Sequence, residues 1–159
     1  MKQFEINIMN NIIVEVPLIS DLKEIVDVEI DGEEQYRKES ENIIKNLIKN
    51  KRIFVCKSEN KIVGYLSWVN NFMAREDFYY FEQIRIDSKY RKLGFASYLI
   101  KYFLDYAKNN NIRKIFGDIH KKNVASLNLC LKLGAVKSGI ITGIDPNGEE
   151  KIIIRFDLE

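Results

Sequence analysis

Apolar residues recur along the chain in two spacings, which predict alternating strands and helices. The clearest helical spacing runs from Ala96 to Ala107, where apolar residues return every three or four positions. Short runs rich in β-branched and aromatic residues predict strands, as at Ile62–Val69. Further strands are predicted at residues 12–16, 52–57, 78–86, 113–119, 135–142 and 151–158, and further helices at 22–30, 40–49 and 123–133.

Cap and turn residues separate these elements. Ser20 is a good N-cap for the first helix, Glu59-Asn60 predicts the turn of an antiparallel hairpin, and Gly134 ends the last helix. The segment 145–148 predicts the closing turn, and Phe4–Met9 alternates as an additional edge strand would. The order β-α-α-β-β-β-α-β-α-β-β predicts an α/β (α+β) fold, a mixed and mostly antiparallel sheet flanked by helices.

Length and composition limit the classes of protein that fit this pattern. The chain has 159 residues, and we expect residues 1–159 to form a single domain. Its hydrophobic fraction of 46% supplies a buried core and excludes a disordered chain. The formal net charge of +2 lacks the cationic excess that phosphate backbones or anionic lipids require. We therefore expect neither nucleic acid nor a membrane as a partner.

The cysteines and the first residues bear on the compartment. Cys56 and Cys130 lie far apart, with no further Cys or His at metal-ligand spacing, so we expect neither a disulfide framework nor a metal site. The N-terminal residues alternate in polarity, unlike the unbroken apolar run of a signal peptide. The expected location is the reducing cytoplasm.

A glycine-containing turn precedes the clearest helix. Arg91-Lys92-Leu93-Gly94-Phe95-Ala96 joins a strand to that helix, whose first N–H groups and dipole together favour an anion. Gly94 lets backbone approach a ligand, Ala96 keeps the helix start open, and Arg91 and Lys92 add charge. A tight strand-to-helix turn with solvated basic residues would have the same sequence, so the residues leave both interpretations open.

These segments resemble the GNAT superfamily of N-acetyltransferases. The family's acetyl-coenzyme A loop reads Gln/Arg-x-x-Gly-x-Gly/Ala, and residues 91–96 agree at all four defined positions. Ile84-Arg85-Ile86 precedes the loop as the family's central strand does, and Asn123-Val124-Ala125-Ser126 with Leu133-Gly134 resembles its second cofactor segment. The resemblance covers most of the chain.

The resemblance implies that acetyl-coenzyme A binds where two strands splay apart, one ending at Ile86 and the other at Ile119. The backbone of Ile84 and Ile86 would bind the acetyl and pantetheine groups, and the N–H groups of residues 92–97 the pyrophosphate. Asn123 would contact the cofactor with its amide, although an N-cap role explains an Asn there equally well. The implied cofactor-binding residues are Ile84, Arg85, Ile86, Arg91, Lys92, Leu93, Gly94, Phe95, Ala96, Ser97, Asn123 and Ser126.

Acetyl transfer to an amine requires a base, because an ammonium has no lone pair with which to attack a thioester. Glu82 is the first candidate, since it lies two residues before Ile84 on the same strand face. Its flanks, Phe81 and Ile84, predict a partly buried setting. Asp118 is the second candidate, on the neighbouring strand at a position where family members carry a catalytic carboxylate. A solvated or salt-bridged carboxylate explains either residue without catalysis.

Two more residues are candidates for proton transfer. Cys130 stands where most family members have a tyrosine that protonates the departing thiolate, so it is a candidate acid. We favour a packing role, because Cys130 shares a helix face with Leu127 and Leu131. His120, the only histidine, could relay a proton, but a solvated loop position explains it better.

The acceptor is expected to be an amine, and a cationic one is suggested by composition. In the family's fold the first two helices and the loop before the central strand form the acceptor site. Here those segments hold acidic residues and aromatic ones, namely Asp27, Glu29, Asp31, Glu33, Glu34, Trp68, Phe72 and Tyr79. A solvated acidic loop would show the same run of charge.

The resemblance implies an acetyl-coenzyme A-dependent N-acetyltransferase that moves an acetyl group to a primary amine by direct attack in a ternary complex. No well-placed nucleophile compels a covalent enzyme intermediate. The alternatives are a non-catalytic acetyl-coenzyme A-binding sensor of the same fold, favoured by Cys130, and an unrelated phosphate-binding domain. Each is compatible with a monomer or a homodimer.

Overall fold

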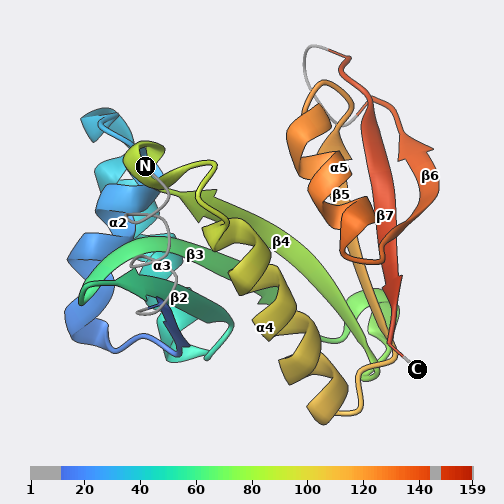
Figure 1. Cartoon of the computed structure of the whole chain (residues 1–159), viewed down its shortest axis with the longest axis horizontal. Helices are drawn as coiled ribbons and strands as arrows, with labels where there is room; N and C mark the ends of the chain where they lie inside the picture. Colours follow the sequence, from blue (N-terminus) through green and yellow to red (C-terminus); the bar gives the residue numbers. More distant parts are fainter. Residues whose placement is uncertain (1–11, 144–147, 159) are drawn as a thin grey trace. The chain divides into compact units, whose positions relative to one another are not determined.

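The computed structural model describes residues 12–143 and 148–158, and its elements follow the predicted order (Figure 1). The strands are β1 (Ile12–Glu15), β2 (Ile53–Ser58), β3 (Lys61–Val69), β4 (Phe78–Ile86), β5 (Lys114–His120), β6 (Val136–Ile141) and β7 (Lys151–Asp157). The α-helices are α2 (Leu22–Ile30), α3 (Arg37–Lys49), α4 (Phe95–Asn109) and α5 (Val124–Lys132). Short 3₁₀ helices are η1 (Ile19–Asp21), η2 (Glu34–Tyr36), η3 (Phe72–Ala74) and η4 (Ser88–Tyr90).

The strands form a sheet in the order β1-β2-β3-β4-β5-β7-β6. Pairing is antiparallel between β1 and β2, β2 and β3, β5 and β7, and β6 and β7. The pair β4 and β5 is parallel, which requires a crossover connection, and α4 supplies it. The predicted α/β fold with a mixed, mostly antiparallel sheet is thus confirmed.

Two compact units, interleaved in the sequence, make up the described chain. The first takes in the chain up to Ser67 together with Gln83–Phe103, and the second Trp68–Glu82 together with the chain from Leu104 onward. Strands β3 and β4 and helix α4 each contribute residues to both units.

The core of the first unit forms where the apolar faces of α2 and α3 meet strand residues. Ile25 and Val26 of α2 are fully buried, as are Ile53 and Val55 of β2. The same cluster includes the buried side chains Val28, Ile30, Ile44, Leu47, Ile48, Ile62 and Tyr65. The helical spacing of apolar residues therefore marks these core faces correctly.

Aromatic side chains build much of the second unit's core. The Trp68 ring stacks on Tyr79 at a centroid distance of 6.4 Å and packs against Tyr106 at 5.6 Å. Gly117 of β5 lies close to Phe81, whose carbonyl oxygen would be 3.3 Å from a Cβ at this glycine. Side chains larger than glycine are disfavoured there, because they would push β4 and β5 apart.

The predicted hairpin is confirmed, and its turn explains the result. Glu59 and Asn60 have φ angles of +51° and +64°, and two successive positive values are typical of the type I′ turn that matches the twist of antiparallel strands. The predicted N-cap is wrong, because Ser20 lies within η1 and Asp21 precedes α2. Asp21 instead accepts a hydrogen bond from the Leu18 N–H at 2.8 Å.

Other boundaries shift by a few residues, because capping and pairing decide helix and strand ends. Helix α3 begins at Arg37, three residues before the predicted start, and β5 runs to His120. The expected strand at Phe4–Met9 and most of the turn at 145–148 fall outside the described residues. No helix in the described part of the chain is long and apolar enough to cross a membrane.

We predict that Gly64→Ala destabilises the protein by about 1–3 kcal/mol, because an added Cβ at this buried position would overlap Ile86 and approach the Arg85 carbonyl oxygen to 2.8 Å. Urea unfolding followed by circular dichroism measures the change. Gly139→Ala is the matched strand control, since its Cβ would lie 3.4 Å from the Ile153 side chain. Equal stability of the two variants would contradict the prediction.

Candidate active site

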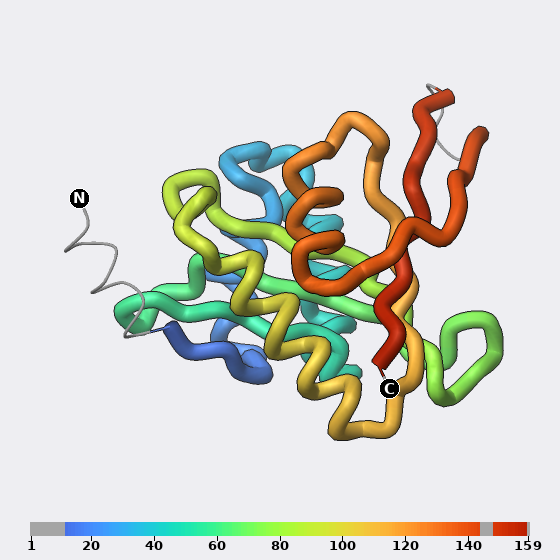
Figure 2. Tube along the Cα trace, turned by 45° about the vertical axis from the view of Figure 1, so that its right-hand side comes forward, coloured from blue at the N-terminus to red at the C-terminus, as the bar shows by residue number. Residues whose placement is uncertain are grey.

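The turn between β4 and α4 has an unusual backbone. Lys92 and Gly94 have positive φ angles of +65° and +89°, within a turn that leads straight into the first residue of α4 (Figure 2, yellow-green). A Cβ at Gly94 would meet nothing within 4 Å, so the space beside this backbone is open. The Gly94 carbonyl accepts the N–H of Tyr98 at 3.2 Å, which begins the helix. Left-handed residues in such a turn direct successive N–H groups toward one side, the arrangement that binds anions.

Asp87 holds the start of this turn. Its N–H donates to the Val63 carbonyl at 2.9 Å, and its side chain accepts the N–H of Lys89 at 2.9 Å as the cap of η4. The ring of Tyr90, at the end of η4, packs edge to face on the ring of Phe95, with a centroid distance of 6.0 Å. Phe95 is 1% exposed, so the first residue of α4 is fixed by its own side chain.

Arg91 ties the turn to two other segments. Its Nε donates a hydrogen bond to the Ile86 carbonyl at 3.1 Å. Its Nη2 lies 2.8 Å from Oδ2 of Asp31, in the loop after α2. The sequence suggested Arg91 as a source of charge for an anion. In the structure its side chain braces the end of β4 against the loop after α2.

The residues of β4 and of the start of α4 that were suggested for cofactor binding also lie in the first unit. Ile84 and Ile86 of β4 are half-buried, and Ala96 and Ser97 lie half-buried in the first turn of α4. Arg85 points to the opposite face of β4, where its Nε lies 3.2 Å from Glu29 Oε2. Its side chain is therefore engaged with α2.

The two candidate bases occupy equivalent positions in β4 and β5. Parallel pairing runs from Phe78 opposite Lys114 to Phe81 opposite Gly117. Glu82 and Asp118 are the next residue on each strand, at the point where the ladder ends. The resemblance implied a splay between the strands that end at Ile86 and Ile119, just beyond this ladder.

The environments of the two carboxylates differ. Asp118 accepts a hydrogen bond from the Tyr80 hydroxyl and forms an ion pair of 2.9 Å with Lys151 of β7. Glu82 is exposed, so the predicted partly buried setting is wrong. Of the two flanks on which that prediction rested, Phe81 is buried on the opposite face of the strand, because successive side chains alternate, and Ile84 is only half-buried.

Asn123 is the N-cap of α5, in the second unit. Its Oδ1 accepts the N–H of Ser126 at 3.2 Å, so the capping role predicted as the simpler alternative is confirmed. The bond uses the oxygen of the amide and the backbone of Ser126. The Nδ2 group of Asn123 remains the donor suited to a ligand.

Cys130 and His120 were the remaining candidates for proton transfer. Cys130 is 3% exposed, and burial raises the pKa of its thiol to about 11. A donor of that pKa is a weaker acid than an ordinary thiol, which titrates near 8.5, so the setting favours packing. His120 is the last residue of β5, not a loop residue, and its Nδ1 lies 3.4 Å from a Glu149 carboxylate oxygen.

The expected aromatic surface near the acceptor is wrong in part. Trp68 and Tyr79 are 1% and 8% exposed, since they stack on each other in the core of the second unit. Phe72 is half-buried against Tyr80, with a centroid distance of 4.9 Å. No cluster of three or more potential metal ligands occurs within residues 12–143 and 148–158.

Comparison with known proteins assigns this arrangement to a family. Residues 19–135 match the family described as the acetyltransferase (GNAT) family. The chain belongs to the acetyltransferase (GNAT) family. The matched segment includes the β4–α4 turn with Gly94, both candidate carboxylates and Asn123, so the resemblance drawn from the sequence motifs is confirmed at the level of the family.

Solved structures share the same fold. A GNAT acetyltransferase from Bacillus cereus has a TM-score of 0.78 at 28% identity, covering 92% of this chain and 96% of its own. An N-acetyltransferase from Staphylococcus aureus has a TM-score of 0.78 at 20% identity, covering 94% and 99%. The ribosomal-protein-alanine N-acetyltransferase of Brucella melitensis has a TM-score of 0.78 at 16% identity, covering 92% and 99%. The search of curated proteins gave no match.

Sequence reasoning missed the partners of the candidate residues. Tyr80 and Lys151, which hold Asp118, come from β4 and β7, and Asp31, which holds Arg91, comes from the loop after α2. Alternation along β4 puts Tyr80 on the face of Glu82, which is a signal the sequence did contain. The pairing of Lys151 depends on the β5–β7 register, for which the sequence has no signal.

We predict that both cysteines react slowly with iodoacetamide in the folded protein at pH 8. Burial raises the pKa of Cys130 to about 11 and that of Cys56 to about 12, so the reactive thiolate of Cys130 is on the order of 10⁻³ of the population. Peptide mass spectrometry against urea-unfolded protein measures each rate. Labelling of folded Cys130 at the unfolded rate would restore it as a candidate acid.

Proposed function

We propose that this protein transfers the acetyl group of acetyl-coenzyme A to a primary amine, by direct attack of the amine in a ternary complex. Gly94 is the observation that carries the proposal. Its positive φ and the open space beside it allow a pyrophosphate to lie against the backbone at the start of α4. Membership of the GNAT family supplies the acetyl-transfer chemistry.

Binding is proposed to rest mainly on backbone groups. The N–H groups from Lys92 to Ser97 bind the pyrophosphate, and Arg91 positions this turn through its bonds to Ile86 and Asp31. The Ile86 carbonyl already accepts from Arg91, so Ile84 is the stronger candidate for the pantetheine amides. Asn123 contributes its Nδ2 donor while its oxygen caps α5.

The ammonium loses one proton to the base before the attack and a second, to solvent, as the amide forms, and the sulfur gains one. The neutral amine nitrogen attacks the thioester carbonyl, the N–C bond forms, and the C–S bond breaks with its electron pair going to sulfur. Glu82 is the proposed base, because it is exposed where the β4–β5 ladder ends and lies on the strand face of Ile84. The thiolate of coenzyme A takes its proton from solvent, since the buried Cys130 is a poor donor.

Thiol release tests the function directly. Incubation with acetyl-coenzyme A and a panel of primary amines is expected to release coenzyme A in an amine-dependent manner, detected with a thiol reagent after quenching. Tight binding of acetyl-coenzyme A with no release for any amine would favour the sensor module. Equal affinity for ATP and coenzyme A would favour a general phosphate-binding domain.

We predict that Gly94→Glu weakens coenzyme A binding by about 10- to 100-fold, because the added carboxylate occupies and repels the pyrophosphate position. Isothermal titration calorimetry measures the affinity. Gly143→Glu is the matched control, since Gly143 also has a positive φ, +76°, and open space. This control introduces the same backbone strain as Gly94→Glu but lies outside the β4–α4 turn. Unchanged affinity in folded Gly94→Glu would contradict the cofactor site.

We predict that Glu82→Gln lowers turnover by about 10²-fold at pH 6–7 and by less as the pH approaches the amine pKa near 10. The loss becomes smaller at high pH because a larger fraction of the amine is then already deprotonated and needs no base. Turnover against pH measures the effect, and Glu76→Gln, exposed in the loop before β4, is the control. A loss that is the same at every pH would indicate a structural role for Glu82.

A further inference from the structure

Three acidic residues lie at the C-terminal end of α2. Asp27 and Glu29 belong to its last turn, and Asp31 is the residue at which the helix is capped. The last turn holds no basic residue, so all three charges stand at the end where the helix dipole is negative. Each carboxylate therefore costs the helix some stability unless a cation offsets it.

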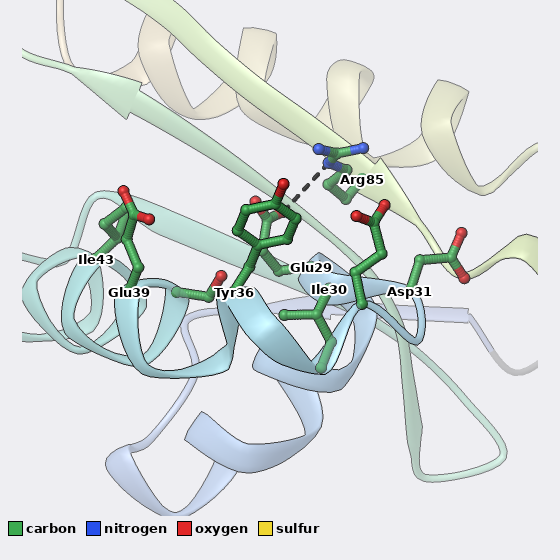
Figure 3. Close-up of a pocket in the computed structure, with 9 residues that line it drawn as sticks. Glu29, Ile30, Asp31, Tyr36, Glu39, Ile43 and Arg85 are labelled. Atoms are coloured by element: carbon green, nitrogen blue, oxygen red, sulfur yellow. Dashed lines mark hydrogen bonds and ion pairs between the residues drawn. The ribbon is translucent and has the colours of Figure 1, made fainter.

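An arginine meets each of these carboxylates within the first unit. The pairs are Asp27–Arg37 at 2.8 Å, Glu29–Arg85 at 3.2 Å and Asp31–Arg91 at 2.8 Å. Figure 3 shows Glu29 and Asp31 among the residues that line a pocket beside α2 and α3, with the ion pair to Arg85 dashed. The first two pairs join α2 to α3 and to β4. The third reaches the turn that precedes α4.

The backbone of Asp31 adds a second local cost. Its φ of +44° and ψ of +40° lie in the left-handed region, where glycine carries no steric penalty. The pair with Arg91 offsets little of this cost, because the two side chains are 53% and 39% exposed and exposed ion pairs contribute little to stability. Within the described residues, Arg91 is the hydrogen-bond partner of the Asp31 side chain.

The contact acts on the backbone that enters the cofactor turn. Arg91 immediately precedes Lys92, whose φ of +65° is strained for a residue with a side chain. The guanidinium of Arg91 is fixed at two points, by the Ile86 carbonyl and by Asp31. Its planar fork holds two such acceptors in a set geometry, which a flexible ammonium does not. The strained turn is thus supported by a residue at the end of α2.

We propose that Asp31 is a positioning residue for the cofactor. Resting on the proposed binding of coenzyme A at the β4–α4 turn, Asp31 acts through Arg91 to hold Lys92 and Gly94 in the conformation that binds the pyrophosphate. Asp31 thereby lowers the stability of α2 and raises the affinity of a turn that it does not itself form. This assigns Asp31 to the cofactor and not to the acceptor.

Calorimetric titration of coenzyme A into the full chain tests the proposal. Asp31→Asn removes the charge and keeps a residue that tolerates a positive φ. We expect it to weaken coenzyme A binding about two- to fivefold, the range that an exposed ion pair supports. Removal of a negative charge near an anion site would by itself strengthen binding, so the expected loss has the opposite sign to a direct charge effect.

Urea unfolding separates positioning from a general loss of structure. Asp31→Gly places glycine at the left-handed position and removes the charge from the helix end, so we expect a urea midpoint equal to or above that of the wild type, with the same loss of affinity. A fall in the midpoint of both Asp31 variants would indicate a structural role and overturn the proposal. Asp27→Asn is the matched control and keeps wild-type affinity for coenzyme A, because its pair with Arg37 has the same length and does not reach the turn.

The Arg91→Gln background tests whether Asp31 acts through Arg91. Adding Asp31→Asn to it is expected to change coenzyme A affinity less than twofold, and additive losses would overturn the proposal. Unchanged or tighter binding in the single variant Asp31→Asn overturns the inference and leaves the proposed function standing. Weakened binding without thiol release for any amine supports the inference and overturns acetyl transfer. Absence of coenzyme A binding in the wild type overturns both.

Discussion

The carboxylate of Glu29 is the interaction on which the arrangement of the first unit depends. It sits half-buried on α2 and receives donors from Tyr65 of β3 and from Gln83 and Arg85 of β4. One helix residue thereby fixes α2 against two strands. Hydrogen bonds to a charged group contribute more than neutral ones, and losing either partner leaves a partly buried group unsatisfied.

A second bridge extends this arrangement to the turn after β4. Arg91 spans the Ile86 carbonyl and Asp31, so the loop that follows α2 is tied to the segment that begins α4. The turn can then keep its two left-handed residues, whose strain the surrounding bonds hold in place. Preorganised N–H groups bind an anion without first paying for their own ordering.

Local patterns in the sequence were enough to predict the order of elements, and the turn at Glu59-Asn60 and the cap at Asn123 follow from chemistry within four residues. The strand-to-helix turn at Gly94 was predicted because its motif is contiguous. The environment of Glu82 was predicted wrongly, because Phe81 is buried on the opposite face of the strand and Ile84, on the same face, is only half-buried. A pocket lined by residues of both α2 and α3 depends on how the two helices pack, which the spacing of apolar residues does not encode.

The interleaving of the two units limits how the chain can be divided into shorter pieces. Neither unit is a contiguous stretch, because the segment Trp68–Glu82 separates the parts of the first and Gln83–Phe103 separates the parts of the second. A single truncation therefore cannot isolate either one. The parallel pairing of β4 with β5 also closes a long loop that contains Gln83–Phe103 of the first unit, and closing such a loop costs conformational entropy.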